Sequence, residues 1–243
     1  LRAPDGCPWD REQTHQSLRR NLLEEAYEVL EAIDAGKPDA LREELGDLLL
    51  QIVLHGQIAV EDGEFSMADV IAAIDAKLKR RHPHVFGDVQ VSGVGDVIAN
   101  WEAIKKGERT ENGNGDKSAL DGIPRALPAL TQAEAYGDRA SRIGFDWRSI
   151  DGVFDKVMEE LGELEATSTP EEREAEFGDL LFAMVNVARW LKIDPEAALR
   201  SANAKFAERF RAVEAQARAR SLDMKKMSVA ELDVLWEAAK RQV

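Results

Sequence analysis

Residues 43–49 of the chain read EELGDLL, and residues 176–181 repeat the pattern as EFGDLL. In each copy a glutamate precedes an aspartate by three positions, and two leucines follow the aspartate. Residues three apart lie on one side of an α-helix, so both copies predict a helix with two carboxylates on the same side. The rest of the sequence decides what surrounds these two helices.

Helix signals continue along the chain on both sides of the two copies. Ser66 and Ser228 each precede an acidic residue by three positions, which is the spacing of a capping box. Thr169 and Asp194 each precede a proline, which favours the first position of a helix. Well over half of the residues fall in helical patterns, against about a third in an ordinary globular protein. We predict an all-α fold with helices at residues 10–35, 39–63, 66–83, 96–106, 124–141, 150–166, 169–191 and 194–220 and from 228 onward, and a loop at 85–97.

The two halves of the chain resemble each other in four blocks that recur in the same order with similar gaps. The first half has EEAYE at 24–28, EELGDLL at 43–49, DAKLKRR at 75–81 and NWEAIK at 100–105. The second half has EELGE at 159–163, EFGDLL at 176–181, NAKFAER at 203–209 and LWEAAK at 235–240. The repeat predicts two duplicated helical domains, residues 1–106 and 124–243, with a flexible linker at 107–123. Residues 107–117, GERTENGNGDK, contain no apolar side chain, as expected of a linker.

Composition excludes several classes of protein. The 243 residues include 46 acidic and 32 basic side chains, for a net charge of −14. A protein that binds a nucleic acid polymer needs a basic surface, so that class is disfavoured. Hydrophobic residues make up 44%, which is too many for a disordered chain. The single cysteine suits a reducing compartment, and no apolar stretch is long enough to span a bilayer, so we expect a soluble cytoplasmic protein without membrane contact.

Each half places two pairs of carboxylates on consecutive predicted helices. A helical wheel puts each pair at the edge of the apolar stripe, so two such helices packed antiparallel bring four carboxylates together. Clustered anions raise one another's pKa unless a cation lies among them, and Mg²⁺ takes such oxygen ligands. The predicted ligands are Glu25, Glu28, Glu44 and Asp47 in the first half, and Glu160, Glu163, Glu176 and Asp179 in the second.

Cationic and aromatic residues recur together with the carboxylates. A lysine and an arginine four positions apart share one helix face and are suited to phosphate oxygens. A tryptophan four positions before a lysine offers a flat ring beside a cation, which suits a nucleotide. These candidates are Lys77, Arg81, Trp101 and Lys105 in the first half, and Lys205, Arg209, Trp236 and Lys240 in the second.

Two other classes of site are weaker interpretations of the same residues. A ferritin-like di-iron bundle needs Glu-x-x-His on two helices, and the chain has that spacing once, at Glu12 and His15. His82 and His84 flank a proline and are interpreted as loop residues rather than zinc ligands. A non-catalytic helical module that serves dimerisation or regulation stays open as an alternative for the first half alone.

The chain resembles the MazG nucleoside triphosphate pyrophosphohydrolases in their two-domain form. The resemblance lies in a Glu-Glu-x-x-Glu motif, followed by Glu-x-x-Asp on the next helix and by a downstream Lys and Arg. The first half adds GCPWD at 6–10, QTH at 13–15 and RHPHVFG at 81–87, which are similar to first-domain signatures. RIGFDW at 142–147 is similar to a second-domain signature. The acidic motifs by themselves occur more widely, in dimeric dUTPases and phosphoribosyl-ATP pyrophosphohydrolases.

The resemblance implies an all-α fold that forms a homodimer and hydrolyses nucleoside triphosphates, ATP among them, to the monophosphate and pyrophosphate. It implies Mg²⁺, with Mn²⁺ as a substitute, held by the four carboxylates of each site. In the second half it assigns catalysis to Glu160, Glu163, Glu176 and Asp179, phosphate contacts to Lys205 and Arg209, and nucleotide contacts to Trp236 and Lys240. Ala175 departs from the family pattern, in which a glutamate is frequent at this position, although Glu174 is adjacent.

The mechanism expected from these residues is attack of a water molecule on the α-phosphorus. A carboxylate of the site takes the proton, and Glu163 is the candidate. Lys205 and Arg209 stabilise the charge on the leaving pyrophosphate. Helix patterns do not indicate which base is preferred.

Overall fold

The computed structural model describes residues 1–111 and 118–241 of the chain. Helices account for 73% of the structure, and the described residues contain no β-strand, so the predicted all-α fold is confirmed. The chain divides into two compact units, Leu1–Gly115 and Asp116–Val243. Each unit is described separately.

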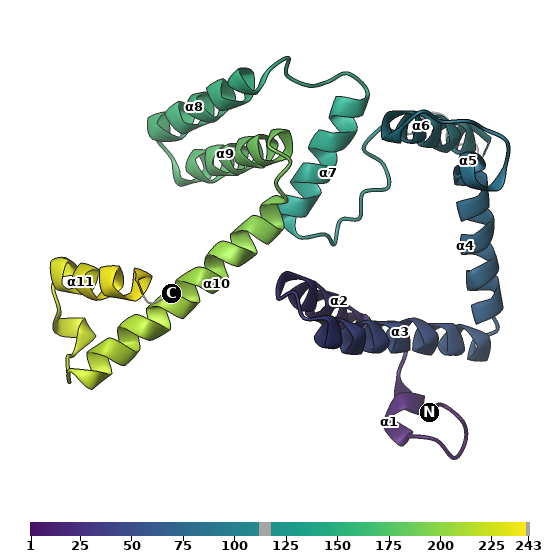
Figure 1. Cartoon of the computed structure of the whole chain (residues 1–243), viewed down its shortest axis with the longest axis horizontal. Helices are drawn as coiled ribbons and strands as arrows, with labels where there is room; N and C mark the ends of the chain where they lie inside the picture. The colour runs from purple at the N-terminus through teal and green to yellow at the C-terminus, as the bar shows by residue number, and fades with distance from the viewer. Residues whose placement is uncertain (112–117, 242–243) are drawn as a thin grey trace. The chain divides into compact units, whose positions relative to one another are not determined.

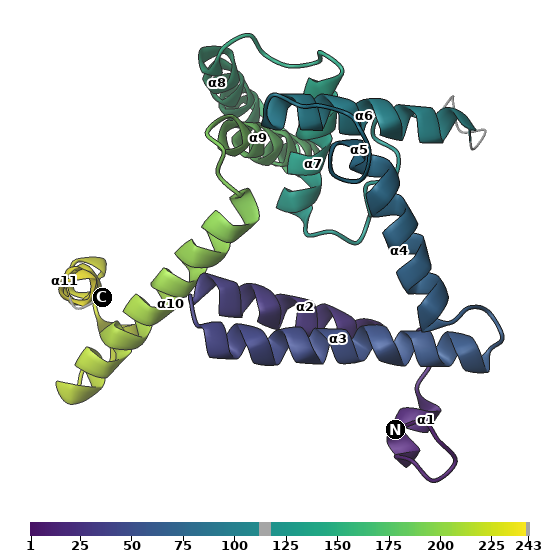
Figure 2. The same cartoon turned by 45° about the vertical axis from the view of Figure 1, so that its right-hand side comes forward.

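Unit 1 is built around a helical hairpin. Helices α2 and α3 lie side by side in both views, joined by a short turn at residues 35–37 (Figures 1 and 2). Helix α4 leaves the end of α3 and contacts α5 and α6. The elements are α1 (Pro8–Glu12), α2 (Arg19–Asp34), α3 (Pro38–Glu61), α4 (Met67–Arg81), α5 (Pro83–Phe86) and α6 (Val94–Glu111).

Unit 2 contains a second hairpin of the same kind, formed by α8 and α9, and α7 packs against α9. Helix α10 leaves the hairpin after α9 and pairs with α11 (Figure 1). The elements are α7 (Ala129–Arg142), α8 (Ile150–Ala166), α9 (Pro170–Trp190), α10 (Pro195–Ala219), the 3₁₀ helix η1 (Met224–Lys226) and α11 (Val229–Lys240).

Four of the helix starts predicted from capping residues are confirmed. The side chains of Ser66, Thr169 and Ser228 each accept a hydrogen bond from the backbone N–H three residues on, within complete capping boxes. Asp194 caps α10 in the same way, with a proline at the first helical position. Capping depends on a few neighbouring residues, which is why the sequence predicts it well.

The prediction of one helix over residues 10–35 is wrong, because the chain leaves the helix after Glu12 and resumes it at Arg19. Between them the backbone N–H of Thr14 donates to Ser17 Oγ, and the N–H of Ser17 donates to Thr14 Oγ1. Such local bonds from hydroxyl side chains compete with helical hydrogen bonding. The interruption also allows Leu18, which is fully buried, to pack against α3.

Three other boundaries differ from the prediction. Helix α7 begins at Ala129 rather than Pro124, because a residue that precedes a proline, here Leu127, avoids the helical conformation. The short helix α5 includes the first two residues of the segment predicted as a loop at 85–97. Helix α6 continues to Glu111, past the predicted start of the linker at 107. The central part of that linker, 112–117, lies outside the described residues.

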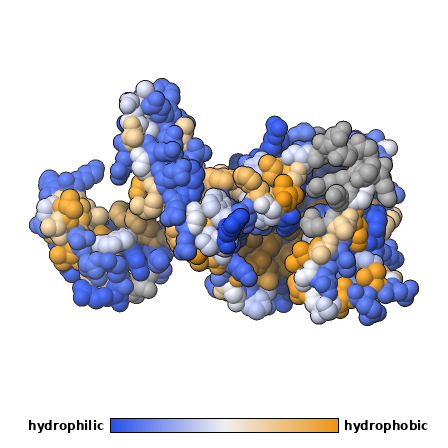
Figure 3. Space-filling model, turned by 90° about the horizontal axis from the view of Figure 1, so that it is seen from above, coloured by the Kyte–Doolittle hydropathy of each residue, from blue (hydrophilic) through white to orange (hydrophobic). Residues whose placement is uncertain are grey.

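The buried core of each unit is small. Leu18, Leu54 and Ile58 form one cluster in unit 1, and Val213 and Leu235 belong to another between α10 and α11. Many large hydrophobic side chains of both hairpins are exposed. Figure 3 shows hydrophobic residues of the chain among hydrophilic ones on the face drawn. None of the described helices combines the length and the apolar character that crossing a bilayer requires.

Candidate metal centre

The hairpin of unit 2 brings three predicted ligands together. Glu160 and Glu163 lie on α8 and Glu176 lies on α9, and one carboxylate oxygen from each falls within 4.8 Å of the others. Glu160 is only 5% exposed, Glu176 is half-buried and Glu163 is exposed. Asp179, one turn after Glu176 on α9, is exposed and lies outside this group. We call Glu160, Glu163 and Glu176 the acidic cluster of unit 2.

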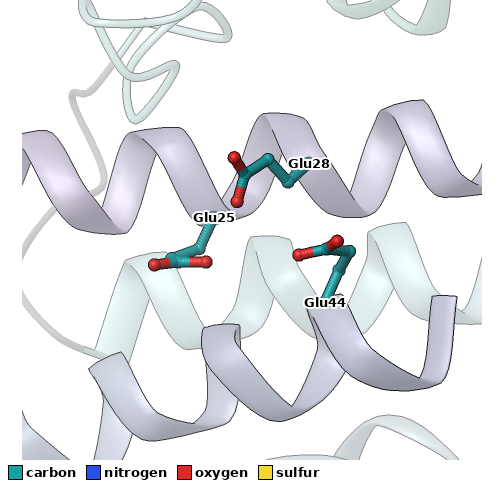
Figure 4. Close-up of side chains that lie close together, drawn as sticks. All are labelled: Glu25, Glu28 and Glu44. Carbon is teal, nitrogen blue, oxygen red and sulfur yellow. The ribbon is translucent and has the colours of Figure 1, made fainter. Parts of the chain in front are cut away.

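The hairpin of unit 1 repeats this arrangement. Glu25 and Glu28 on α2 and Glu44 on α3 place one oxygen each within 4.8 Å of the others, and we call them the acidic cluster of unit 1. Figure 4 shows the three carboxylates directed toward the space between the two helices. Asp47 is exposed and outside the group, as Asp179 is in unit 2. In both units the structure therefore assembles three of the four predicted ligands.

The carboxylates of both clusters disfavour one another's ionised forms. Burial, followed by the charges of Glu28 and Asp47, raises the pKa of Glu25 above its usual value. The pKa of Glu44 is raised by burial and then by the charge of Glu28. In unit 2, burial and the charges of the neighbouring carboxylates raise the pKa of Glu176. A cation placed among these oxygens relieves that repulsion.

Unit 2 has a cationic side chain beside its cluster that the sequence analysis missed. Lys156 Nζ lies 2.6 Å from Glu160 Oε1 and 2.8 Å from Glu159 Oε1. Its hydrogen bonds to the two carboxylates raise the pKa of the Lys156 ammonium. Alignment of EELGE with EEAYE places Asn21 at this position in unit 1, so the residue is not part of the repeat. The sequence signal for it is its position four residues before Glu160, which places both side chains on one face of α8.

The predicted phosphate-binding cations lie on helices that leave the hairpins. Lys77 and Arg81 are on α4, and Lys205 and Arg209 are on α10. Among the ion pairs that the structure describes, none joins these four residues to an acidic cluster. Arg81 instead binds Glu108 of α6, with Nη2 2.7 Å from Oε2.

Arg209 has no acidic partner of this kind in the described part of the chain, and its buried Nε makes no hydrogen bond.

The two tryptophans lie near the cations that accompany them in sequence. Lys105 Nζ lies 4.9 Å from the centre of the Trp101 ring, a cation–π contact. Trp236 packs on Phe206 of α10 with 5.4 Å between ring centres, one residue from Lys205. Lys240 forms an ion pair with Glu237 one turn before it on α11. Among the described residues, the direct contact between a predicted cation and its tryptophan is thus the one between Lys105 and Trp101.

Sequence comparisons identify the class to which this arrangement belongs. Residues 13–86 match the model of the MazG nucleotide pyrophosphohydrolase domain, and this range contains the acidic cluster of unit 1. The described helices and their paired carboxylates therefore define a chain of the all-helical nucleotide pyrophosphohydrolase class.

Several known proteins are similar to the whole chain. A Thermotoga maritima protein named nucleoside triphosphate pyrophosphohydrolase/pyrophosphatase MazG is 48% identical over 99% of this chain and 91% of its own length. The Escherichia coli K12 nucleoside triphosphate pyrophosphohydrolase is 47% identical over 100% of this chain and 94% of its own. The Bacillus subtilis uncharacterized protein YabN is 48% identical over 99% of this chain, which covers 49% of it. The chain belongs to the MazG family.

Proposed function

We propose that the chain hydrolyses nucleoside triphosphates between the α- and β-phosphates, releasing a monophosphate and pyrophosphate, with a divalent cation at its acidic clusters. Membership of the MazG family supports the reaction, because two similar full-length relatives are named for it. The observation that carries the site is the convergence of three carboxylate oxygens within 4.8 Å in each unit.

The residues of the clusters fit Mg²⁺. Carboxylate oxygens are the ligands that this hard cation takes, and with few protein ligands it keeps other positions for water and substrate phosphates. The raised pKa of Glu176 and Glu44 indicates negative charge that a cation would balance. Glu160, Glu163 and Glu176 would hold the ion in unit 2, with Asp179 completing the set from the same helix as Glu176. The equivalent set in unit 1 is Glu25, Glu28, Glu44 and Asp47, and Mn²⁺ would substitute.

The bound cation would supply charge neutralisation at the phosphates and a lower pKa for the attacking water. The protein side chains supply the rest. Glu163, the exposed member of the unit 2 cluster, accepts the proton of that water. Lys156 holds Glu160 in place and offers its ammonium to a phosphate oxygen. Lys205 and Arg209 bind the leaving pyrophosphate, and Trp236 with Lys240 holds the nucleotide.

We assign catalysis to the predicted second domain, residues 124–243, which lies within unit 2, and treat the two halves as a tandem duplication. Glu160 of unit 2 is buried and paired with a lysine, and Arg209 has a buried nitrogen without a partner in the described structure. In unit 1 asparagine stands in place of that lysine, and Arg81 is bound by Glu108. A regulatory or dimerising role for unit 1 is therefore the second candidate, favoured by these two differences.

We further propose that the chain acts as a homodimer in the cytoplasm. Exposed apolar side chains on both hairpins give a second copy a surface to cover. These include Leu23, Ile33, Leu45 and Leu49 in unit 1, and Met158, Leu161, Phe177 and Leu181 in unit 2. The substrates are free nucleotides rather than nucleic acid polymers, since the net charge of −14 repels a polymer of phosphates.

The test is pyrophosphate release from a panel of nucleoside triphosphates with and without Mg²⁺. Glu160→Gln and Glu176→Gln each keep the side-chain volume and remove a ligand charge, so we expect losses of at least about a hundredfold. The variants Glu25→Gln and Glu44→Gln measure how much of the pyrophosphate release depends on unit 1. Glu165→Gln is the matched control, because Glu165 is exposed on α8 outside the cluster. Unchanged Mg²⁺-dependent release in both unit 2 variants contradicts the site assignment.

A further inference from the structure

The two acidic clusters have the same carboxylates and different neighbours. Each consists of two glutamates on the first helix of the hairpin and one on the second. The repeat aligns Glu25 with Glu160, and it therefore aligns Asn21 with Lys156, four residues earlier on the helix. Residues four apart lie on one face of a helix, so both of these side chains start beside their cluster. An uncharged amide in unit 1 thus takes the place of a cation in unit 2.

The cluster of unit 2 contains its own counter-cation. Lys156 Nζ lies 2.6 Å from Glu160 Oε1, an oxygen of a buried side chain. Mg²⁺ binds carboxylate oxygens at about 2.0–2.1 Å, so an ion held by Glu160 lies close to this ammonium, and the two cations repel each other. To bind a free metal ion, unit 2 must therefore accept this repulsion or pull Lys156 away from both Glu159 and Glu160.

The cluster of unit 1 has no such neighbour in the part of the chain that the structure describes. Among the ion pairs described for residues 1–111, none includes a glutamate of this cluster. Arg20, the residue before Asn21, binds Glu24 instead, with 2.9 Å between Nε and Oε1. The three carboxylates are directed toward the space between α2 and α3 (Figure 4). They face this space without a cation to balance them.

The charges around the glutamate on the second helix of each hairpin show the same difference. Burial, and then the negative charge of Glu28 and of other carboxylates, raises the pKa of Glu44. Burial and neighbouring carboxylates also raise the pKa of Glu176, but there the ammonium of Lys156 acts in the opposite direction. The field at the cluster is therefore less negative in unit 2 than in unit 1.

We propose that Lys156 is an internal counter-cation that makes unit 2 bind a free divalent cation more weakly than unit 1, an inference that rests on the cation sites of the proposed function. One elementary charge within about 5 Å of a divalent ion changes its Kd roughly tenfold, even at the dielectric constant of water. At low metal concentration the free ion therefore occupies the acidic cluster of unit 1.

The lysine also gives unit 2 a preference for a cation that arrives together with a polyanion. A chain of phosphates supplies the negative charge that the ammonium cancels, so metal ion and polyphosphate bind unit 2 together. Unit 1 needs no such ligand, because its three carboxylates are already unbalanced. Unit 1 is thus a site for a resident ion, whereas the ion of unit 2 binds and leaves with its ligand.

The test exchanges the two aligned residues and counts bound Mn²⁺ ions. Titration of the full chain with Mn²⁺, followed by electron paramagnetic resonance of the free ion, gives the number of sites and their Kd without any nucleotide. We would compare the wild type with Asn21→Lys, Lys156→Asn and the double variant. Glu44→Gln or Glu176→Gln, added to each, removes one cluster at a time and assigns each ion to a unit.

In the wild type we expect one tightly bound Mn²⁺ per chain, which Glu44→Gln removes and Glu176→Gln does not. Asn21→Lys should weaken this site roughly tenfold, and Lys156→Asn should tighten binding at unit 2 by a similar factor. In the double variant the tighter site should move to unit 2. The two single variants change the Kd in opposite directions and in different units, so loss of folding in one leaves the other as a test.

The matched controls make the same charge changes away from the clusters. Ala73→Lys adds a lysine at an exposed position on α4, and Lys225→Asn removes one from an exposed position on η1. Neither residue belongs to an acidic cluster, so both Kd values should stay as in the wild type.

The proposal is overturned if the two units of the wild type bind Mn²⁺ equally well, if unit 2 binds it more tightly, or if the exchange leaves both Kd values unchanged. Pyrophosphate release is measured separately. A chain that shows the expected Mn²⁺ binding but releases no pyrophosphate contradicts the proposed function alone. A chain that releases pyrophosphate and binds Mn²⁺ equally well at both clusters overturns the role of Lys156 alone.

Discussion

The ammonium of Lys156 lies 2.6 Å from a carboxylate oxygen of Glu160, the most buried of the acidic residues in the two clusters. This pair distinguishes two otherwise similar hairpins. Burying a carboxylate without a partner is costly, and the lysine one turn earlier on α8 supplies the partner. Unit 1 has Asn21 at this position, and its Glu25 is less buried.

Replacement of Lys156 should make unit 2 more dependent on a metal ion. In Lys156→Gln the three carboxylates lose their cationic neighbour, so repulsion among them destabilises the metal-free protein and lowers its Tm by about 2–4 °C. Added Mg²⁺ should then raise the Tm by more than it does in the wild type. Thermal unfolding in EDTA and in Mg²⁺ measures both effects. The control is Lys225→Gln, at an exposed position on η1. If Mg²⁺ raises the Tm of both variants equally, Lys156 does not balance the charge of the acidic cluster.

The contact between Glu108 and Arg81 should stabilise unit 1 in a pH-dependent way. Hydrogen bonds from Arg81, and then from Arg80, lower the pKa of Glu108 from 4.5 to about 2. Because the folded-state pKa is depressed, the stabilisation is complete above pH 4.5 and is lost as the pH falls toward 2. Glu108→Gln should lower the Tm at pH 7 by about 3 °C and flatten its dependence on pH below 4.5.

Asp75→Asn serves as the control for this prediction, because it breaks the exposed pair with Lys79 on the same helix and leaves Arg80 and Arg81 unchanged. Exposed pairs contribute little, so its Tm should stay within about 1 °C of the wild type. If the two variants lose the same stability, the Glu108 contact has no special role.

Two stacked histidines should make unit 1 sensitive to mild acid. The rings of His15 and His55 are 5.0 Å apart and nearly parallel, and their Nδ1 atoms are 2.7 Å apart, so one nitrogen donates a hydrogen bond and the other accepts it. Burial, and then the charge of His15, lowers the pKa of His55 below 6.5. The unfolded chain therefore binds more protons below pH 6.5, and stability falls as the pH drops through this value.

We expect the Tm of wild-type unit 1 to fall by about 2 °C or more between pH 7.5 and pH 5.5, and to fall less in His55→Phe. All four histidines of the chain precede residue 116, so unit 2 provides an internal reference without this titration. Circular dichroism at the two pH values measures the difference. An unchanged pH dependence in His55→Phe would show that the pair does not titrate in this range.

Two glycines of unit 2 should respond in opposite directions to alanine. In Gly137→Ala the new methyl group meets Asn186 and Arg189 at about 3 Å, so we expect a loss of about 1–3 kcal/mol in the free energy of unfolding. Gly162 on α8 has no neighbouring atom within 4 Å of such a methyl group, and unit 1 has Tyr27 at the matching position. Gly162→Ala should therefore stabilise the chain by roughly 0.5–1 kcal/mol through helix propensity. Chemical denaturation gives both values, and equal effects would contradict the packing at Gly137.

Local sequence predicted the parts of this protein that depend on near neighbours. Capping boxes and prolines placed the starts of α4, α9, α10 and α11, and spacing by three predicted which carboxylates share a helix side. The break before α2 was missed, because the hydroxyl contacts of Thr14 and Ser17 compete with the helix only once both residues turn toward each other. The three-carboxylate groups could be predicted from a helical wheel, whereas the exposed positions of Asp47 and Asp179 could not.

By itself the sequence determined an all-helical chain, its pairs of carboxylates and their repetition in two halves, since these follow from helical periodicity and composition. Only the tertiary structure decided that Glu160 is buried, that Glu108 binds Arg81, and that rings from three segments enclose a cavity beside α9. These contacts join side chains from different elements or depend on burial. They are therefore set by how the helices pack rather than by the order of residues along any one of them.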